Sequence, residues 1–272
     1  MKTNLCHSYI ILVCFVYCLS DANAQLKLTN SEITFYAGLR SFYWEEYNDQ
    51  GASIIEDEGF LFCPGVSATV FFSENIPFYI YTKGNIYLGT VDYSGFLQDT
   101  NGDVEDYNSE TAYFGTEIML NFGYLFKTAD NFAIYPEAGF IYHYWSRDID
   151  NGGQYGYDEE YQSVSINFGF NSKVIISENS DLNMRLLGTY PIVIMESIDL
   201  ASRDQGGPAD IELEPGADLG ILGEIGINVY GIHAGFYFNL TNYLKSDEDQ
   251  GYHQPESYRE DIGINLGCTL KF

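Results

Sequence analysis

The sequence predicts an all-β chain that closes into an antiparallel, up-and-down transmembrane β-barrel of about ten strands. Three observations predict this fold class. Apolar residues occupy every second position in ten segments, the connections between these segments are alternately short and long, and the charges within the segments avoid the apolar positions. The composition agrees, because 24 Tyr, 19 Phe and 27 Gly against 7 Pro are typical of aromatic strands and glycine-containing turns.

The N-terminus predicts a secretory signal peptide. Lys2 precedes an apolar run at residues 9–19, and the small-residue site Ala22-Asn23-Ala24 follows in the arrangement that signal peptidase reads. We therefore expect residues 1–24 to be cleaved after Ala24 and residues 25–272 to form one β-barrel domain. The apolar run is shorter than the ~20 residues of a transmembrane helix, and no later segment reaches that length. A membrane-spanning fold of this chain must therefore be a closed barrel.

The strands are predicted by period-two alternation that begins at about residue 31. In the first segment Ile33, Phe35 and Leu39 lie on one parity and Arg40 lies on the other. Such alternation predicts strands with one apolar face, although Leu187 and Val193 blur it in the seventh segment. The expected strands cover residues 33–39, 60–72, 78–88, 114–122, 134–142, 164–176, 184–194, 219–227, 232–240 and 262–272.

The connections between these strands alternate in length. Outer-membrane barrels place short turns in the periplasm and long loops outside the cell, and single-chain bacterial barrels have an even number of strands. Ten strands with both termini on the side of the short turns satisfy both rules. Short turns are expected near residues 73–77, 127–131, 177–181 and 228–231, and long extracellular loops near residues 45–58, 94–110, 146–160, 196–218 and 245–261.

Charge placement separates a lipid-facing barrel from a soluble one. Eight charged residues lie deep within the strands, and each has the polar parity of its own strand. This is expected of a lipid face, where a mid-membrane Arg or Lys costs roughly 2–4 kcal/mol. The alternative is a soluble periplasmic or secreted β-barrel that binds a ligand, but the many tyrosines on the polar parity and the loop asymmetry weigh against it. The eight residues are Arg40, Lys83, Glu117, Glu137, Lys173, Arg185, Glu224 and Lys271.

The closing segment, Leu266-Gly267-Cys268-Thr269-Leu270-Lys271-Phe272, resembles the last strand of bacterial outer-membrane β-barrel proteins, and the whole chain resembles the small barrels of Bacteroidota. In that family a final aromatic residue, preceded by apolar residues at alternate positions, is the signal read by the barrel-assembly machinery. The resemblance implies this role for Leu266, Leu270 and Phe272, with Cys268 as an unusual member of the series. It also implies an outer-membrane location, with outer-membrane lipid, lipopolysaccharide and, during biogenesis, the assembly machinery as partners.

The barrel interior offers two interpretations. About eight strands enclose a space that side chains just fill, whereas wide channels need about 16 strands. Five cations and three anions among the eight charged residues therefore predict a plug of ion pairs and hydrogen bonds, because buried charges must be paired. The alternative is a narrow, weakly cation-lined conduit for a small solute.

Acidic residues gather in the predicted long loops, which contain 29 of the chain's 39 Asp and Glu. The net charge of −27 excludes nucleic acid as a partner, because binding it requires clustered Lys and Arg. No cofactor is expected apart from a calcium ion, for which the loop at residues 94–110 has an EF-hand-like spacing at positions 1, 3, 5, 7 and 12. The glycine of position 6 is replaced by Val104. The candidate ligands are Asp99, Asn101, Asp103, Glu105 and Glu110.

Enzymatic activity is not expected. His143 is the histidine that the strand pattern places near the outer rim, and no paired catalytic motif accompanies it. Cys63 and Cys268 have opposite parities on strands that the first strand separates, so we expect no disulfide between them. The leading hypothesis is an integral outer-membrane barrel with acidic surface loops and a structural, adhesive or receptor-like role, and the alternative is a narrow porin.

Overall fold

The side chains of a β-strand alternate between its two faces, so the period-two pattern of this sequence places apolar residues outside the barrel and the other residues inside it. All strands of the described chain belong to one antiparallel sheet. The computed structural model describes residue 28 and residues 30–73, 76–98, 104–150, 156–200 and 211–272, so the predicted signal peptide, residues 1–24, lies outside the described residues. The strands are β1 (Glu32–Tyr47), β2 (Ser53–Phe62), β3 (Gly65–Ser73), β4 (Ile76–Gln98), β5 (Val104–Tyr124), β6 (Phe126–Ala129), β7 (Phe132–Asp148), β8 (Asp158–Ser177), β9 (Ser180–Asp199), β10 (Ile211–Leu213), β11 (Gly216–Ala217), β12 (Gly220–Val229), β13 (Ile232–Leu244) and β14 (Glu256–Lys271).

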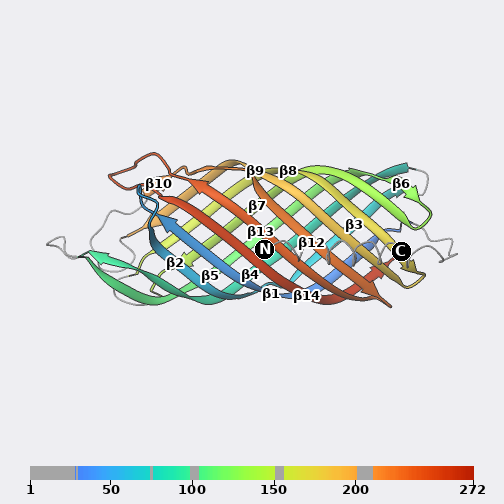
Figure 1. Ribbon diagram of the computed structural model, residues 1–272, viewed down its shortest axis with the longest axis horizontal. Coiled ribbons are helices and arrows are strands. Elements are labelled where there is room, and N and C mark those ends of the chain that lie inside the picture. The colour runs from blue at the N-terminus through green and yellow to red at the C-terminus, as the bar shows by residue number, and fades with distance from the viewer. Residues whose placement is uncertain (1–27, 29, 74–75, 99–103, 151–155, 201–210) are drawn as a thin grey trace, which may run out of the picture.

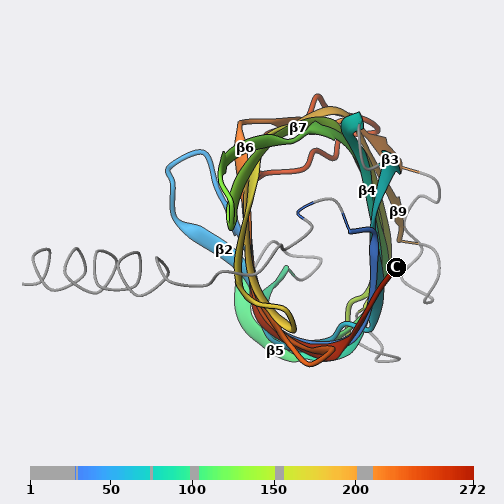
Figure 2. The same ribbon diagram turned by 90° about the vertical axis from the view of Figure 1, so that its right-hand side faces the viewer.

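The first and last strands close the sheet into a ring (Figures 1 and 2). β1 pairs with β14 along its whole length, from Glu32 opposite Lys271 to Tyr47 opposite Glu256. Each other strand of the ring pairs with its neighbours in chain order, and β2 and β3 together occupy one position between β1 and β4. The ring thus has ten positions, which confirms the predicted up-and-down barrel: β1, β2 with β3, β4, β5 with β6, β7, β8, β9, β12, β13 and β14.

The predicted second strand is interrupted between β2 and β3. Pro64 lies at the interruption and has no N–H to donate. The backbone of Cys63 still exchanges hydrogen bonds of 2.8 and 2.9 Å with Gly38 of β1, and the Pro64 carbonyl accepts one from Ile86 of β4. The wall therefore remains continuous at this point.

The connections differ between the two ends of the barrel. Hairpins at one end are tight, as between Val229 and Ile232, where Tyr230 and Gly231 both have positive φ angles (52° and 81°), as a two-residue turn of type I′ requires. The start of β1 and the C-terminus lie at this end, on the right in Figure 1. By the rule for outer-membrane barrels this is the periplasmic end, and the end with long connections is extracellular.

The strands extend further at the extracellular end than the sequence predicts. The expected loop at residues 94–110 is largely a hairpin, because β4 continues to Gln98 and β5 begins at Val104. In the same way β2 begins at Ser53, inside the expected loop at residues 45–58. Polar side chains on both parities suggested loops, but cross-strand hydrogen bonds hold this backbone extended in water as well as in lipid.

Apolar side chains cover the outside of the barrel, and polar and aromatic side chains make up most of the inside. Phe60, Leu266 and Phe168 are 64%, 62% and 53% exposed, whereas Arg40 and Glu117 are fully buried. A soluble protein has the opposite distribution, and an apolar surface of this size indicates contact with lipid. No helix within the described residues is long and apolar enough to cross a membrane.

Val193 blurs the alternation of the seventh predicted strand because of a β-bulge in β9, whereas Leu187 is an apolar residue that is buried in the interior. Val164 pairs with Val193, but Ser165 pairs with Pro191, so Ile192 is an extra residue. Ile192 and Val193 are both exposed on the outside, and the parity of the strand is reversed beyond them. Ile194, which was expected on the lipid-facing parity, therefore lies in the interior, where it is 6% exposed.

A closed ring of this kind has no free strand edge within the membrane, which predicts resistance to detergent. We expect the unboiled protein to migrate in SDS gels as a compact, fast species and the boiled protein to migrate near its full mass. Gel migration before and after boiling is the measurement. Identical migration of the two samples under mild detergent would contradict a stable barrel.

Candidate functional site

The eight predicted interior charges face the barrel interior, which we call the lumen. Arg40, Lys83, Glu117, Glu137, Lys173 and Arg185 are buried, and the side chains of Glu224 and Lys271 are 17% and 29% exposed. Seven of the eight take part in ion pairs, and the partners come from strands far apart in the sequence. Lys173 pairs with Glu32, and Lys271 pairs with Asp181, near the periplasmic end.

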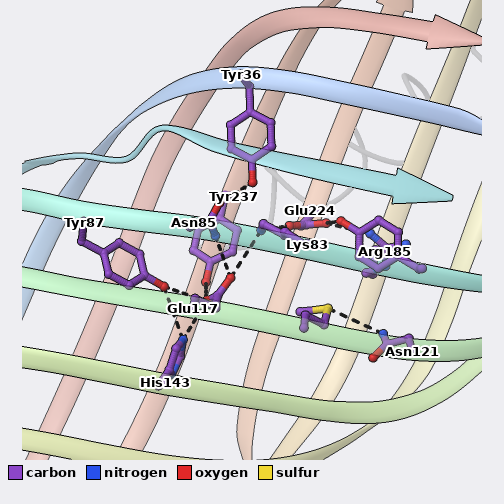
Figure 3. Close-up of polar contacts among 12 residues, drawn as sticks. Tyr36, Lys83, Asn85, Tyr87, Glu117, Asn121, His143, Arg185, Glu224 and Tyr237 are labelled. Carbon is purple, nitrogen blue, oxygen red and sulfur yellow. Dashed lines mark hydrogen bonds and ion pairs between the residues drawn. The ribbon is translucent and has the colours of Figure 1, made fainter.

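Glu117 of β5 is the centre of a buried hydrogen-bond network (Figure 3). The residues that surround its carboxylate come from three other strands, β4, β7 and β13. Because a buried carboxylate without partners would be very costly, this number of donors explains how the lumen holds the charge. The contacts to its oxygens are from His143 at 2.7 Å, Asn85 at 2.8 Å, Tyr87 at 2.9 Å, Tyr237 at 3.3 Å and Lys83 at 3.7 Å.

A second network lies next to it and is bridged by Glu224 of β12 (Figure 3). Glu224 pairs with Lys83 and, at 2.9 Å, with Arg185, whose Nε donates to Glu137 at 2.6 Å. The guanidinium of Arg185 also lies 3.5 Å from the centre of the Tyr81 ring. Cations and anions therefore alternate across the lumen.

Arg40 is fully buried, and its guanidinium nitrogens donate no hydrogen bond to the described residues. Its guanidinium lies over the rings of Tyr237 and Tyr87, at 3.9 and 4.9 Å from their centres. Cation–π contacts of this kind stabilise a desolvated cation by about 2 kcal/mol or more.

A polar cavity of about 80 Å³ lies in the periplasmic half of the lumen. Lys83, Arg185, Glu224 and His233 are among the residues that line it, and Asn265, which also lines it, has an Oδ1 without a hydrogen-bond partner among the described residues. Leu28, which precedes β1, is buried, and its carbonyl accepts a hydrogen bond from Tyr135. A space of this size holds a few water molecules.

Aromatic side chains fill the extracellular half of the lumen. Trp145 of β7 stacks on Tyr161 of β8, with ring centres 4.7 Å apart and planes 5° apart. Trp44 of β1 and Tyr243 of β13 complete the group from the opposite wall, with ring centres 5.4 Å apart. All four are at most 4% exposed, so the rings span the lumen from wall to wall.

A buried acidic cluster lies on the extracellular side of these rings, around the single guanidinium of Arg147. Its nitrogens contact Glu159, Glu46 at 2.8 Å and Asp57 at 3.4 Å. Glu196 of β9, which pairs with Tyr161 of β8, is a fourth buried carboxylate. These residues were expected in loops, but continuing the period-two pattern of each strand past the lipid-facing region places Glu46, Arg147 and Glu159 inside.

The cluster has more carboxylates than cations, and several of these carboxylates have raised pKa values. Burial, opposed by Arg147, raises the pKa of Asp57 and of Glu159 above its usual range. Burial and the neighbouring Glu159 carboxylate raise the pKa of Glu196 well above its usual range. These groups lie at the extracellular edge of the apolar outer surface, since carboxylates flank Asp57 and Glu159 on their strands and Ser197, beyond Glu196 on β9, lies opposite Glu160.

The outer surface at the extracellular end carries a row of like charges. Glu58 lies opposite Asp92, and Asp92 lies opposite Glu110, so three exposed carboxylates stand side by side on β2, β4 and β5. Directly opposed like charges destabilise a sheet. Not all acidic residues of the predicted loops are exposed, however, because Glu46, Asp57, Glu159, Glu196 and Asp261 are buried in the lumen.

The sequence and the structure were compared with those of known proteins. The sequence matches no known protein family, and no curated protein matches it. Among solved structures it is similar to the outer membrane protease OmpT from Escherichia coli, with a TM-score of 0.58 and 11% identity over 89% of this chain and 97% of that chain. The chain has the fold of an outer-membrane β-barrel. A major outer membrane protein from Thermus thermophilus also matches, with a TM-score of 0.42 and 11% identity over 88% of this chain and 99% of that chain.

His143, the candidate catalytic residue of this outer-membrane barrel, lies in the lumen and not at the rim. It is 9% exposed, contacts Glu117 and lies beside Trp145, with ring centres 6.2 Å apart. His233 is nearer the periplasm and contacts Asn228 at 2.9 Å. The absence of enzymatic activity stays a prediction, since OmpT shares the fold and is a protease.

The predicted calcium ligands are divided between two parts of the chain. Asp99, Asn101 and Asp103 lie outside the described residues, whereas Glu105 and Glu110 lie on the extended strand β5. The second half of the expected EF-hand-like loop is therefore a strand, which cannot wrap around an ion as such a loop does. Calcium binding stays a prediction.

The C-terminal strand faces lipid as its pattern predicts. Leu266, Leu270 and Phe272 are 62%, 60% and 69% exposed on the outside of β14 and the residue after it. Cys268 is exposed on the same face, whereas Cys63 is buried in the lumen, and both are free. Recognition of this strand by the assembly machinery stays a prediction.

Proposed function

We propose that this protein is a plugged outer-membrane barrel whose acidic extracellular strands and loops form a surface for adhesion or receptor-like binding. The observation that carries the proposal is the filled lumen. The layer of Trp44, Trp145, Tyr161 and Tyr243 and the adjoining Arg147 cluster fill the extracellular half, and the cavity of about 80 Å³ is confined to the periplasmic half.

The surface supports the same proposal. The row of Glu58, Asp92 and Glu110 costs the sheet stability through repulsion, and a cationic partner that lies over it would remove this cost. Strands that continue beyond the lipid hold these carboxylates in a fixed geometry, as a binding surface requires.

Two measurements test the proposal, one on the reconstituted barrel and one on bacteria that display it. In planar bilayers we expect no discrete channel openings; regular openings that change in Glu117→Ala or Lys173→Ala would instead identify the narrow porin. In cell-binding assays we expect bacteria that display the barrel to attach to a cationic surface more strongly than bacteria that display the triple variant Glu58→Gln, Asp92→Asn, Glu110→Gln. Equal attachment would contradict the adhesive role.

A further inference from the structure

A groove of about 290 Å³ opens on the outer surface where β2 separates from the β4–β5 hairpin. Its walls are formed by Ser53–Glu56 of β2, Ser94–Phe96 of β4, and Asp106 and Asn108 of β5. Figure 2 shows the cause, because the β1–β2 hairpin leans away from the ring of strands at this end. The volume is near the lower end of that of ligand-binding sites, which begins at roughly 300 Å³.

Strand edges face this groove. β2 pairs with β4 as far as Glu56 opposite Ser94, and the described residues beyond that pair are not joined across the opening. Gly95–Gln98 continues to pair with β5 on its other side, so one edge of this piece of β4 has backbone donors and acceptors free of strand pairing within the described residues. A free edge of this kind accepts an additional strand.

The side chains around this edge are acidic, which favours a cationic ligand in the groove. Glu56 and Asp106 line the groove, and the row of Glu58, Asp92 and Glu110 lies next to it, two residues along β2, β4 and β5. No Lys or Arg is among the residues that line the groove in the described part of the chain. Neighbouring strands are about 4.8 Å apart, so the three carboxylates of the row span about 10 Å across the strands and add negative charge at the end of the groove that is nearer the lipid.

Phe96 adds an apolar contact between these charges. It is 48% exposed and lines the groove, together with Ile54 of β2. Lys and Arg side chains combine an apolar stem with a charged head, so their stems can cover Phe96 while their heads reach the carboxylates. A second copy of this chain does not fit, because it would place one acidic groove against another.

We propose that this groove binds an extended cationic peptide segment of a partner protein, which adds to the free edge of β4 as a further strand. This inference rests on the proposed binding role of the extracellular surface and names the class of partner. Backbone hydrogen bonds to Gly95–Gln98 supply one part of the affinity, and ion pairs to Glu56 and Asp106 supply the other.

The test uses the full barrel in detergent micelles and a fluorescein-labelled peptide of eight alternating Lys and Thr residues, followed by fluorescence anisotropy. We expect saturable binding that becomes about tenfold weaker in the double variant Glu56→Gln, Asp106→Asn, as the loss of two exposed ion pairs implies. The control Glu212→Gln, Glu214→Gln removes the same charge from exposed residues outside the groove. It should weaken binding less than about twofold.

A second peptide separates strand addition from charge attraction alone. The same sequence with every backbone amide N-methylated keeps its charge but has no N–H left to donate on either edge, and it should bind at least about tenfold more weakly. Equal binding of the two peptides, or equal weakening by the groove and control variants, would overturn the proposal. The conductance and attachment measurements do not depend on this peptide, so failure here is distinguishable from failure of the proposed function.

Discussion

Replacement of Arg147 by methionine is expected to lower the free energy of unfolding by about 3–5 kcal/mol, the usual cost of removing one partner of a buried ion pair. The guanidinium is 1% exposed and contacts Glu46, Asp57 and Glu159. Without it, these three carboxylates remain buried beside Glu196 and lose the cation that they share. Urea unfolding of the barrel in micelles, followed by tryptophan fluorescence, measures this loss of free energy. Trp44 and Trp145 are suitable probes because they lie beside the cluster.

The matched control is Arg40→Met, which removes the same charge from a site that is equally buried. Arg40 donates no hydrogen bond to the described residues and is held by the rings of Tyr237 and Tyr87. The cation–π contact is lost, but the cost of burying a charge is also removed, so a change below about 1.5 kcal/mol is expected. An equal loss of unfolding free energy in Arg40→Met and Arg147→Met would contradict the prediction, because it would mean that the ion pairs of Arg147 add no stability.

The fold was predictable from the sequence because two environments act on alternate residues of every strand. Lipid excludes charge from one face, so parity alone indicated that Arg40, Glu117 and Lys173 point inward. Parity failed at the bulge in β9, where one extra residue reversed the orientation of Ile194. A single insertion of this kind only blurs the alternation, and the apolar residues at 192, 193 and 194 do not indicate which of them is the extra one.

The contacts within the lumen were not predictable to the same degree. Lys83 and Glu224 are 141 positions apart, and their pairing depends on strand tilt and register around the closed ring. The cluster of Arg147 was missed for a different reason. Above the lipid, both faces of a strand carry polar residues, so Glu46 and Glu159 resembled loop residues although their strands continue and bury them.

The excess of carboxylates at this cluster leads to a pH dependence of stability. Burial raises the pKa of Glu159 and Glu196 in the folded barrel above its usual value near 4.5, so the folded state retains protons that the unfolded chain has already released. A raised pKa gives stability that is fully present below the usual value and is lost as pH rises toward the folded value. Each such proton contributes a slope of about −1.4 kcal/mol per pH unit within that window.

The contribution of Glu196 is isolated by Glu196→Gln, which keeps a polar group near Tyr161 but cannot ionise. As the pH rises above the usual glutamate pKa of about 4.5, we expect the free energy of unfolding of the wild type to fall more steeply than that of the variant, by up to the slope of one proton. Urea unfolding at several pH values measures both, and Glu214→Gln, at an exposed position of the same end, should follow the wild type. Parallel curves for the wild type and Glu196→Gln would mean that Glu196 is ionised in the folded barrel. Glu196 would then be a buried charge beside Glu159 that shares the single cation Arg147 with three other carboxylates, which burial at this depth makes very costly.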